Sequence, residues 1–200
     1  MEIVNLPNKL TMLRIILVPF MIVAILIDFP FHYLVALAVF GAASLTDMFD
    51  GKIARSRGLV TNFGKFSDPL ADKILVISAL LCFVQSGVCD SIIVIVTLFR
   101  EFAVMSVRLL AASDGKVVAA NMWGKVKTVT QIIAIILIFI LQFIMELMKI
   151  GVIPIAADGI AIADNIFYII GEVGLWISTV FCIISGVIYL YDNRKFISEK

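Results

Sequence analysis

Residues 128–145 read TVTQIIAIILIFILQFIM, and this stretch decides the class of fold. It contains no charged residue in 18 positions. Such a run is typical of a helix that crosses a bilayer, because spanning the hydrocarbon core takes about 20 predominantly apolar residues. A strand of a membrane β-barrel would instead alternate apolar and polar residues, so the sequence predicts a membrane-spanning helix.

Comparable apolar runs follow one another on both sides of this stretch. They predict six membrane-spanning helices, at residues 10–28, 33–55, 67–87, 91–112, 124–147 and 171–192. Residues 148–170 are expected to form the one sizeable loop, and a short juxtamembrane helix is expected near Asn5, Pro7 and Asn8. The predicted fold is therefore all-α, a polytopic membrane protein in which residues 1–200 form a single transmembrane domain.

The overall composition supports the same class. Hydrophobic residues make up 62% of the 200 residues and charged residues only 16%, whereas soluble domains average about 45–50% and about 25%. This excludes a disordered chain and an ordinary soluble domain. The net charge of +1 gives no reason to expect nucleic acid as a partner. The three cysteines have no metal-ligand or redox spacing, so we expect them to pack as small apolar residues.

The lysines and arginines are distributed unevenly between the two sides of the predicted membrane. With six spans, one side keeps only Lys149. The other side, which includes both termini, holds Lys9, Arg14, Lys52, Arg55, Arg57, Lys65, Lys73, Lys116, Lys125, Lys127, Arg194, Lys195 and Lys200. Because cytoplasmic loops are rich in lysine and arginine, both termini are predicted to be cytoplasmic, in a multi-pass protein of the cell (plasma) membrane.

Four aspartates flank the connection between the second and third predicted helices. Asp47 and Asp50 are three residues apart, and Asp68 and Asp72 are four residues apart. Either spacing puts both members of a pair on one helix face. The connection is short, so the two helices are predicted to be antiparallel neighbours. The four carboxylates then converge near the cytoplasmic boundary.

Such a cluster of like charges near a membrane is costly unless something neutralises it. Two divalent cations would do so with oxygen ligands. No histidine or cysteine lies nearby, which favours Mg²⁺ or Mn²⁺ over Zn²⁺. Two such ions suit in-line displacement at phosphorus.

Small residues and one arginine accompany the aspartates. Gly51 and Ala54 leave a helix surface bare for a bulky ligand, and Arg55 is a fork that suits a phosphate. Gly64 can take loop conformations that other residues avoid. The alternative interpretation is that the acids are solvated or capping residues, and Asp68 before Pro69 fits a helix N-cap with proline at the first helical position.

The pattern D-x2-D-G-x2-A-R-x8-G-x3-D-x3-D, from Asp47 to Asp72, resembles the signature of the CDP-alcohol phosphotransferase family at every defining position. Flanking residues resemble the phosphatidylglycerophosphate synthase subgroup of that family. They are Asn5, Pro7, Asn8, Thr11, Arg14, Pro19, Arg100, Glu101, Arg108 and the stretch 123–131.

The resemblance implies a reaction and a set of roles. Family members have six transmembrane helices, are usually homodimers, and transfer a phosphatidyl group from CDP-diacylglycerol to an alcohol with release of CMP. The four aspartates resemble the ligands of two Mg²⁺ or Mn²⁺ ions, and Asp72 also resembles the general base. The positions that resemble the CDP-diacylglycerol site are Asp50, Gly51, Ala54, Arg55 and Gly64. In the subgroup the acceptor is glycerol 3-phosphate and the product is phosphatidylglycerol phosphate.

An anionic acceptor needs cations. Arg100 and Arg108 are eight residues apart, about two helical turns, and can share a face. With Lys125 and Lys127 they are the predicted acceptor-phosphate residues. Pairing of Arg100 with Glu101 is not assured, because adjacent helical residues point about 100° apart. A supporting role is predicted for Asn8, Thr11 and Arg14.

Three other interpretations remain open from the sequence, of which a structural membrane protein would leave the four aspartates unexplained. The aspartate pattern fits a phosphatidyltransferase with inositol phosphate, serine or phosphatidylglycerol as acceptor equally well. Acids within a membrane protein also mark cation transporters. A transporter, however, would distribute its acids through the membrane depth, whereas these four gather at one end.

Overall fold

The computed structural model describes the backbone of residues 6–57, 62–113, 118 and 121–196. Side chains are described for residues 8–46, 70–113, 118, 121–156 and 158–196. The described chain contains six α-helices and no strand, followed by a 3-10 turn at Arg194–Phe196. The helices are α1 (Leu6–Leu26), α2 (His32–Arg57), α3 (Asn62–Gln85), α4 (Ser91–Ser113), α5 (Met122–Lys149) and α6 (Ala157–Asp192). The predicted all-α fold is confirmed.

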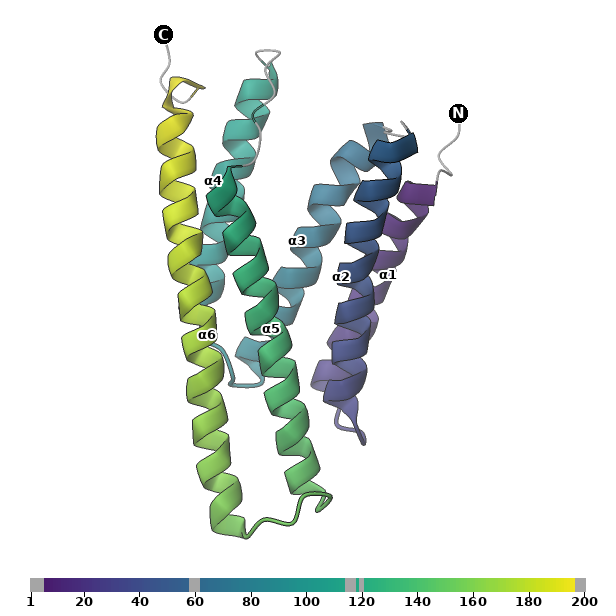
Figure 1. The fold of residues 1–200 in the computed structure, drawn as a ribbon, viewed down its shortest axis with the longest axis vertical. Coiled ribbons are helices and arrows are strands. Elements are labelled where there is room, and N and C mark those ends of the chain that lie inside the picture. Colours follow the sequence, from purple (N-terminus) through teal and green to yellow (C-terminus); the bar gives the residue numbers. More distant parts are fainter. Residues whose placement is uncertain (1–5, 58–61, 114–117, 119–120, 197–200) are drawn as a thin grey trace.

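The helices run up and down in two groups (Figure 1). In the first, α1 packs against α2 and α3, and in the second, α6 packs against α4 and α5. Contacts of α5 with α2 and α3, and of α3 with α4, join the groups. The start of α1 and the end of α6 lie at one end of the molecule, uppermost in Figure 1, which we call the upper end. The ends of α2 and α4 and the starts of α3 and α5 lie toward it too.

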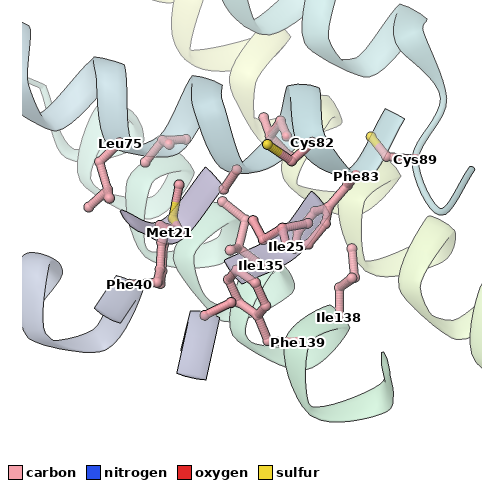
Figure 2. Packing of buried hydrophobic residues seen from close by; sticks show 14 of the residues in the cluster. Met21, Ile25, Phe40, Leu75, Cys82, Phe83, Cys89, Ile135, Ile138 and Phe139 are labelled. Atoms are coloured by element: carbon pink, nitrogen blue, oxygen red, sulfur yellow. The ribbon is translucent and has the colours of Figure 1, made fainter. Parts of the chain in front are cut away.

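A buried apolar core joins the two groups (Figure 2). Phe139 of α5 is completely buried, and its ring centroid lies 4.9 Å from that of Phe83 on α3 and 5.6 Å from that of Phe40 on α2. Met21 and Ile25 of α1 belong to the same cluster. Edge-on and tilted aromatic contacts of this kind add to the gain from burial, so α5 holds the first group in place.

Three of the described helices are long and apolar enough to cross a membrane by length and composition. They are Asn8–Leu26 in α1, Met122–Lys149 in α5 and Asp158–Asp192 in α6. The apolar part of α2, His32–Thr46, is shorter. Charged residues inside the remaining helices, such as Arg100 and Glu101 in α4, lower their hydropathy.

Three predicted boundaries are wrong. The sixth helix begins at Ala157 rather than at residue 171, so the predicted loop 148–170 shrinks to a short connection. Asp158 lies in the first turn of α6, where its negative charge interacts favourably with the helix dipole. Pro7 and Asn8 lie within a first helix that is continuous from Leu6 to Leu26, so the described residues contain no separate juxtamembrane helix, and Asn5 lies outside them.

The third boundary concerns α3. This helix begins at Asn62, so Gly64, Asp68 and Pro69 lie inside it rather than in a loop and a cap. Asp68 is therefore not an N-cap, and the capping alternative for this residue is wrong.

Two glutamates, one on α5 and one on α6, cap the starts of α2 and α4. Glu146 of α5 accepts hydrogen bonds through Oε1 from the backbone N–H groups of Phe31 and His32, at 3.2 Å for His32. Glu172 of α6 accepts the N–H of Asp90 at 2.7 Å. These carboxylates satisfy donors that a helix start leaves without an intrahelical partner.

The three cysteines are buried thiols, as predicted. Cys82 and Cys182 lie inside α3 and α6, whereas Cys89 lies in the connection between α3 and α4. Burial, reinforced by the nearby carboxylates of Glu172 and Asp90, raises the pKa of the Cys89 thiol to about 12. This thiol is therefore uncharged at neutral pH.

Candidate active site

A cavity of about 820 Å³ is lined by residues of α3, α4, α5 and α6. Its lining includes two acids, Asp72 and Glu101, and five cations, which are Lys73, Arg100, Arg108, Lys125 and Lys127. We call it the basic cavity, because the cations outnumber the acids. Its lining residues come from the middle of α3, the middle and end of α4, the start of α5 and, through Tyr189, the end of α6.

The backbone places the four aspartates on two neighbouring helices. Asp47 and Asp50 lie in the last three turns of α2, and Asp68 and Asp72 lie one turn apart on α3. The two helices contact each other and run in opposite directions (Figure 1). Of the four side chains only that of Asp72 is described, and it is half-buried in the wall of the basic cavity.

The predicted CDP-diacylglycerol residues lie on the same two helices. Gly51, Ala54 and Arg55 follow Asp50 on α2, and Gly64 lies on α3. Their side-chain surroundings, and those of Asp47, Asp50 and Asp68, lie outside the described residues. Among the residues whose side chains are described, no group of three or more metal-ligating residues occurs.

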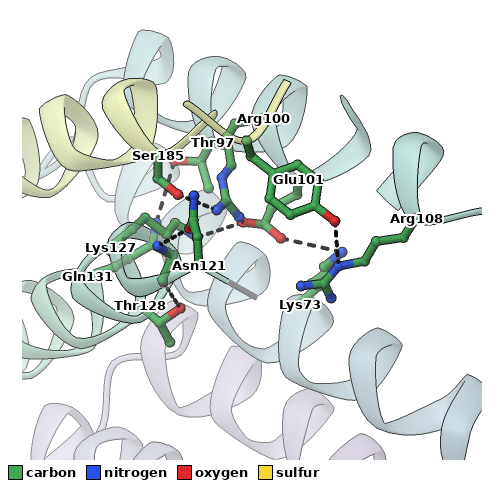
Figure 3. Close-up of polar contacts among 12 residues, drawn as sticks. Lys73, Thr97, Arg100, Glu101, Arg108, Asn121, Lys127, Thr128, Gln131 and Ser185 are labelled. Carbon is green, nitrogen blue, oxygen red and sulfur yellow. Dashed lines mark hydrogen bonds and ion pairs between the residues drawn. The ribbon is translucent and has the colours of Figure 1, made fainter. Parts of the chain in front are cut away.

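Glu101 is the centre of the polar network in the basic cavity (Figure 3). Its Oε1 lies 2.7 Å from Nη1 of Arg100 and 2.8 Å from Nζ of Lys127, and its Oε2 lies 3.4 Å from Nζ of Lys73. One largely buried carboxylate thus binds cations from α3, α4 and α5. Ion pairs taken out of water need close pairing and hydrogen bonds, which Arg100 Nη1 and Lys127 supply to Glu101, whereas the buried Nε of Arg100 has no hydrogen-bond partner.

Arg100 is held from the opposite side by α6. Its Nη2 donates to the hydroxyl of Ser185 at 2.7 Å, so both terminal nitrogens of the guanidinium have partners. Glycines make room for the side chain. A Cβ atom at Gly186 would lie 3.0 Å from Cγ of Arg100, and one at Gly124 would lie 3.5 Å from Nη2.

Arg108 lies two turns along α4 and contacts Tyr189 of α6. Its Nε donates to the tyrosine hydroxyl at 3.3 Å, and the guanidinium carbon lies 5.8 Å from the ring centroid. Within the described chain, the terminal nitrogens of Arg108 have no hydrogen-bond partner. The two arginines therefore share the cavity but differ in how fully they are engaged.

The two lysines at the start of α5 also differ. Lys127 is buried against Glu101, whereas Lys125 is exposed and lines the cavity. Asn121 caps this helix by accepting the N–H of Gly124 at 2.8 Å, which fixes where α5 begins. The structure thus brings all four predicted acceptor cations to one cavity.

The predicted supporting residues lie on one buried face of α1. Asn8, Thr11 and Arg14 follow each other at three-residue spacing, and Arg14 is completely buried. Each has an interaction partner. None of the three lines the basic cavity.

The sequence interpretation missed the contribution of α6. Ser185 and Tyr189 lie four residues apart on the helix face that contacts α4. With Ser178 and Cys182 they form a buried stripe at helical spacing. This spacing in an otherwise apolar helix is the signal that would have indicated a face turned away from lipid.

Comparison with known proteins identifies the family. A family model described as CDP-alcohol phosphatidyltransferase matches residues 4–184. A Bacillus subtilis protein named CDP-diacylglycerol–glycerol-3-phosphate 3-phosphatidyltransferase is 40% identical over 94% of this chain and 95% of its own length. A Rickettsia bellii protein of the same name is 34% identical over 96% of this chain and 97% of its own. The chain therefore belongs to the CDP-alcohol phosphatidyltransferase family.

Proposed function

We propose that the chain transfers the phosphatidyl group of CDP-diacylglycerol to glycerol 3-phosphate, forming phosphatidylglycerol phosphate and CMP. The observation that carries the proposal is the basic cavity, because Asp72 and five cations line the same cavity. An acceptor that is itself a phosphate ester needs such a surplus of positive charge. The names of the relatives at 40% and 34% identity point to the same donor and acceptor.

The four aspartates fit a pair of hard cations, Mg²⁺ or Mn²⁺. Their donor set consists of carboxylate oxygens only, and the backbone brings the two pairs onto antiparallel neighbouring helices. Asp47, Asp50, Asp68 and Asp72 would hold the ions. When bound, the ions supply positive charge to the pyrophosphate, whose leaving group develops negative charge.

Residues of this chain accept the proton and bind the two substrates. Asp72 accepts the proton of the acceptor hydroxyl as that oxygen attacks phosphorus. Asp50, Gly51, Ala54, Arg55 and Gly64 form the surface for the cytidine diphosphate end of the donor. The acceptor phosphate binds to Arg108, Lys125 and Lys127, while Arg100 contributes charge from its fixed place against Glu101 and Ser185.

The membrane setting completes the proposal. All six helices span the bilayer, with both termini and the active site on the cytoplasmic side of the cell membrane, and the protein is a homodimer. The donor then enters from the bilayer, and the water-soluble acceptor and CMP exchange with the cytoplasm.

The test is incorporation of radiolabelled glycerol 3-phosphate into lipid by the purified chain with CDP-diacylglycerol and Mg²⁺ or Mn²⁺. We expect labelled phosphatidylglycerol phosphate, and we expect chelation to abolish its formation. Asp72→Asn should lower kcat at least about a hundredfold, because a general base contributes about 10²–10⁴-fold. The matched control is Asp158→Asn, which makes the same change at an exposed site on α6.

Other outcomes separate the alternatives. Release of CMP only with inositol phosphate, serine or phosphatidylglycerol would keep the active site and replace the acceptor. Folded protein that releases no CMP with any acceptor would contradict the enzymatic proposal and favour cation transport.

A further inference from the structure

Two arginines of α4 line the same cavity, yet their guanidinium groups are engaged differently. The terminal nitrogens of Arg100 are occupied by Glu101 and Ser185 at 2.7 Å each. Arg108 instead uses Nε, its innermost donor, toward Tyr189. Its planar pair of terminal nitrogens remains for a ligand, and this pair is what binds a phosphate with two parallel hydrogen bonds.

The surroundings of Tyr189 fix the position of its side chain and, through it, the orientation of the Arg108 guanidinium. The residue is 2% exposed, and its ring packs with Val104 and Val107 of α4. The hydroxyl is thereby fixed at a point from which it accepts the Nε–H of Arg108 at 3.3 Å. A buried tyrosine hydroxyl normally finds a hydrogen-bond partner, and the hydrogen bond and the ring contact both restrict the guanidinium.

We propose that Tyr189 is a positioning residue for acceptor specificity, which holds Arg108 so that its terminal nitrogens face the phosphate of glycerol 3-phosphate. The inference rests on the proposed function and deepens it. It assigns to α6, which carries none of the family's signature aspartates, the selection of a phosphorylated acceptor over a neutral alcohol.

The test is direct binding of glycerol 3-phosphate to the full-length chain in detergent, measured by isothermal titration. Tyr189→Phe removes only the hydroxyl and keeps the ring. We expect it to weaken binding about threefold to tenfold, as loss of one hydrogen bond predicts. In turnover assays it should raise the KM for glycerol 3-phosphate and leave kcat and the KM for CDP-diacylglycerol unchanged.

Tyr191→Phe is the matched control, because it makes the same change two residues along the same helix. Tyr191 is exposed and stacks with Arg194 at 4.3 Å, outside the basic cavity. It should bind glycerol 3-phosphate as the wild type does. In an Arg108→Ala background, Tyr189→Phe should have no further effect, because its influence passes through that arginine.

Wild-type affinity in Tyr189→Phe, or an equal loss in the Arg108→Ala background, would overturn the inference. So would a wild-type chain that does not bind glycerol 3-phosphate. Failure of the proposed function gives a different result: the wild type binds glycerol 3-phosphate, Tyr189 and Arg108 are coupled, and no phosphatidyl transfer occurs. The positioning role would then stand for a phosphate site of another activity.

Discussion

At the scale of single residues, Glu101 shows how the chain keeps a cluster of cations close to a membrane. Its carboxylate binds Lys73, Arg100 and Lys127, which come from three different helices. Without it these charges would repel one another in a poorly hydrated place. The basic cavity therefore depends on an acid that need not touch a substrate.

This arrangement predicts that two neighbouring lysines differ sharply in their effect on stability. Lys127→Met breaks a largely buried pair at 2.8 Å and should lower the free energy of unfolding by about 3–5 kcal/mol. Lys125→Met changes an exposed side chain of the same helix and should leave the melting temperature nearly unchanged. Thermal unfolding in detergent measures both, and equal losses would contradict the network.

Residue spacing could predict part of the site and not the rest. The spacing of the aspartates placed Asp47, Asp50, Asp68 and Asp72 on two helices, which is where the backbone has them. Spacing does not predict the pairing of Arg100 with Glu101, because adjacent Cβ atoms diverge on a helix. The long arginine side chain nevertheless reaches Glu101 through Nη1, while its Nη2 donates to Ser185 on α6.

At the scale of helices, glutamates of α5 and α6 supply hydrogen-bond acceptors to the starts of α2 and α4. At the start of α2, Glu146 of α5 accepts the N–H of Phe31 and also that of His32, which is shared with the carbonyl oxygen of Phe29. Glu172 of α6 does the same for Asp90 at the start of α4. Sequence patterns within one helix contain no sign of such a cap, because donor and acceptor are more than 80 residues apart.

Removing each glutamate should loosen a different helix start. Glu146→Ala should raise amide hydrogen exchange in the segment around Phe31 and His32 and cost about 0.5–2 kcal/mol, as loss of an N-cap does. Glu172→Ala should raise exchange around Asp90 instead. Each variant is the control of the other, and exchange that rises at both places in both variants would point to global loosening.

Helix length was harder to predict than helix existence. All six predicted helices are present, yet α6 is 36 residues long and begins 14 residues earlier than predicted. Its first turns contain Asp158, Gly159 and Asp164, residues that are typical of loops. A position in the first turn of the helix makes Asp158 favourable, and that position depends on where the preceding connection ends.

At the scale of the whole molecule, the polar residues are divided between two ends. The basic cavity lies in the upper half, and Lys149 lies at the foot of α5. The packing of α6 against α4, which closes the cavity, could not be predicted from sequence. The residue pattern of one helix does not indicate which other helix it contacts. The up-and-down order of the helices follows from short connections alone.

This division predicts the orientation of the protein in the membrane. In right-side-out membrane vesicles, a membrane-impermeant maleimide should label Lys149→Cys and should label Lys195→Cys only after permeabilisation. The reason is the excess of lysine and arginine at the upper end, which favours the cytoplasm. The native cysteines are buried, so the unmodified chain is the background control. The reverse labelling pattern would contradict the proposed topology.

The glutamate caps also have a consequence for the order in which the molecule is made. A ribosome releases α1 to α4 first, and the starts of α2 and α4 then lack Glu146 and Glu172, which have not yet been synthesised. The first group cannot reach its final form until α5 and α6 arrive beside it. A nascent chain halted after residue 121 would therefore contain four helices, two of them with unfinished starts, and no closed cavity to bind an anion.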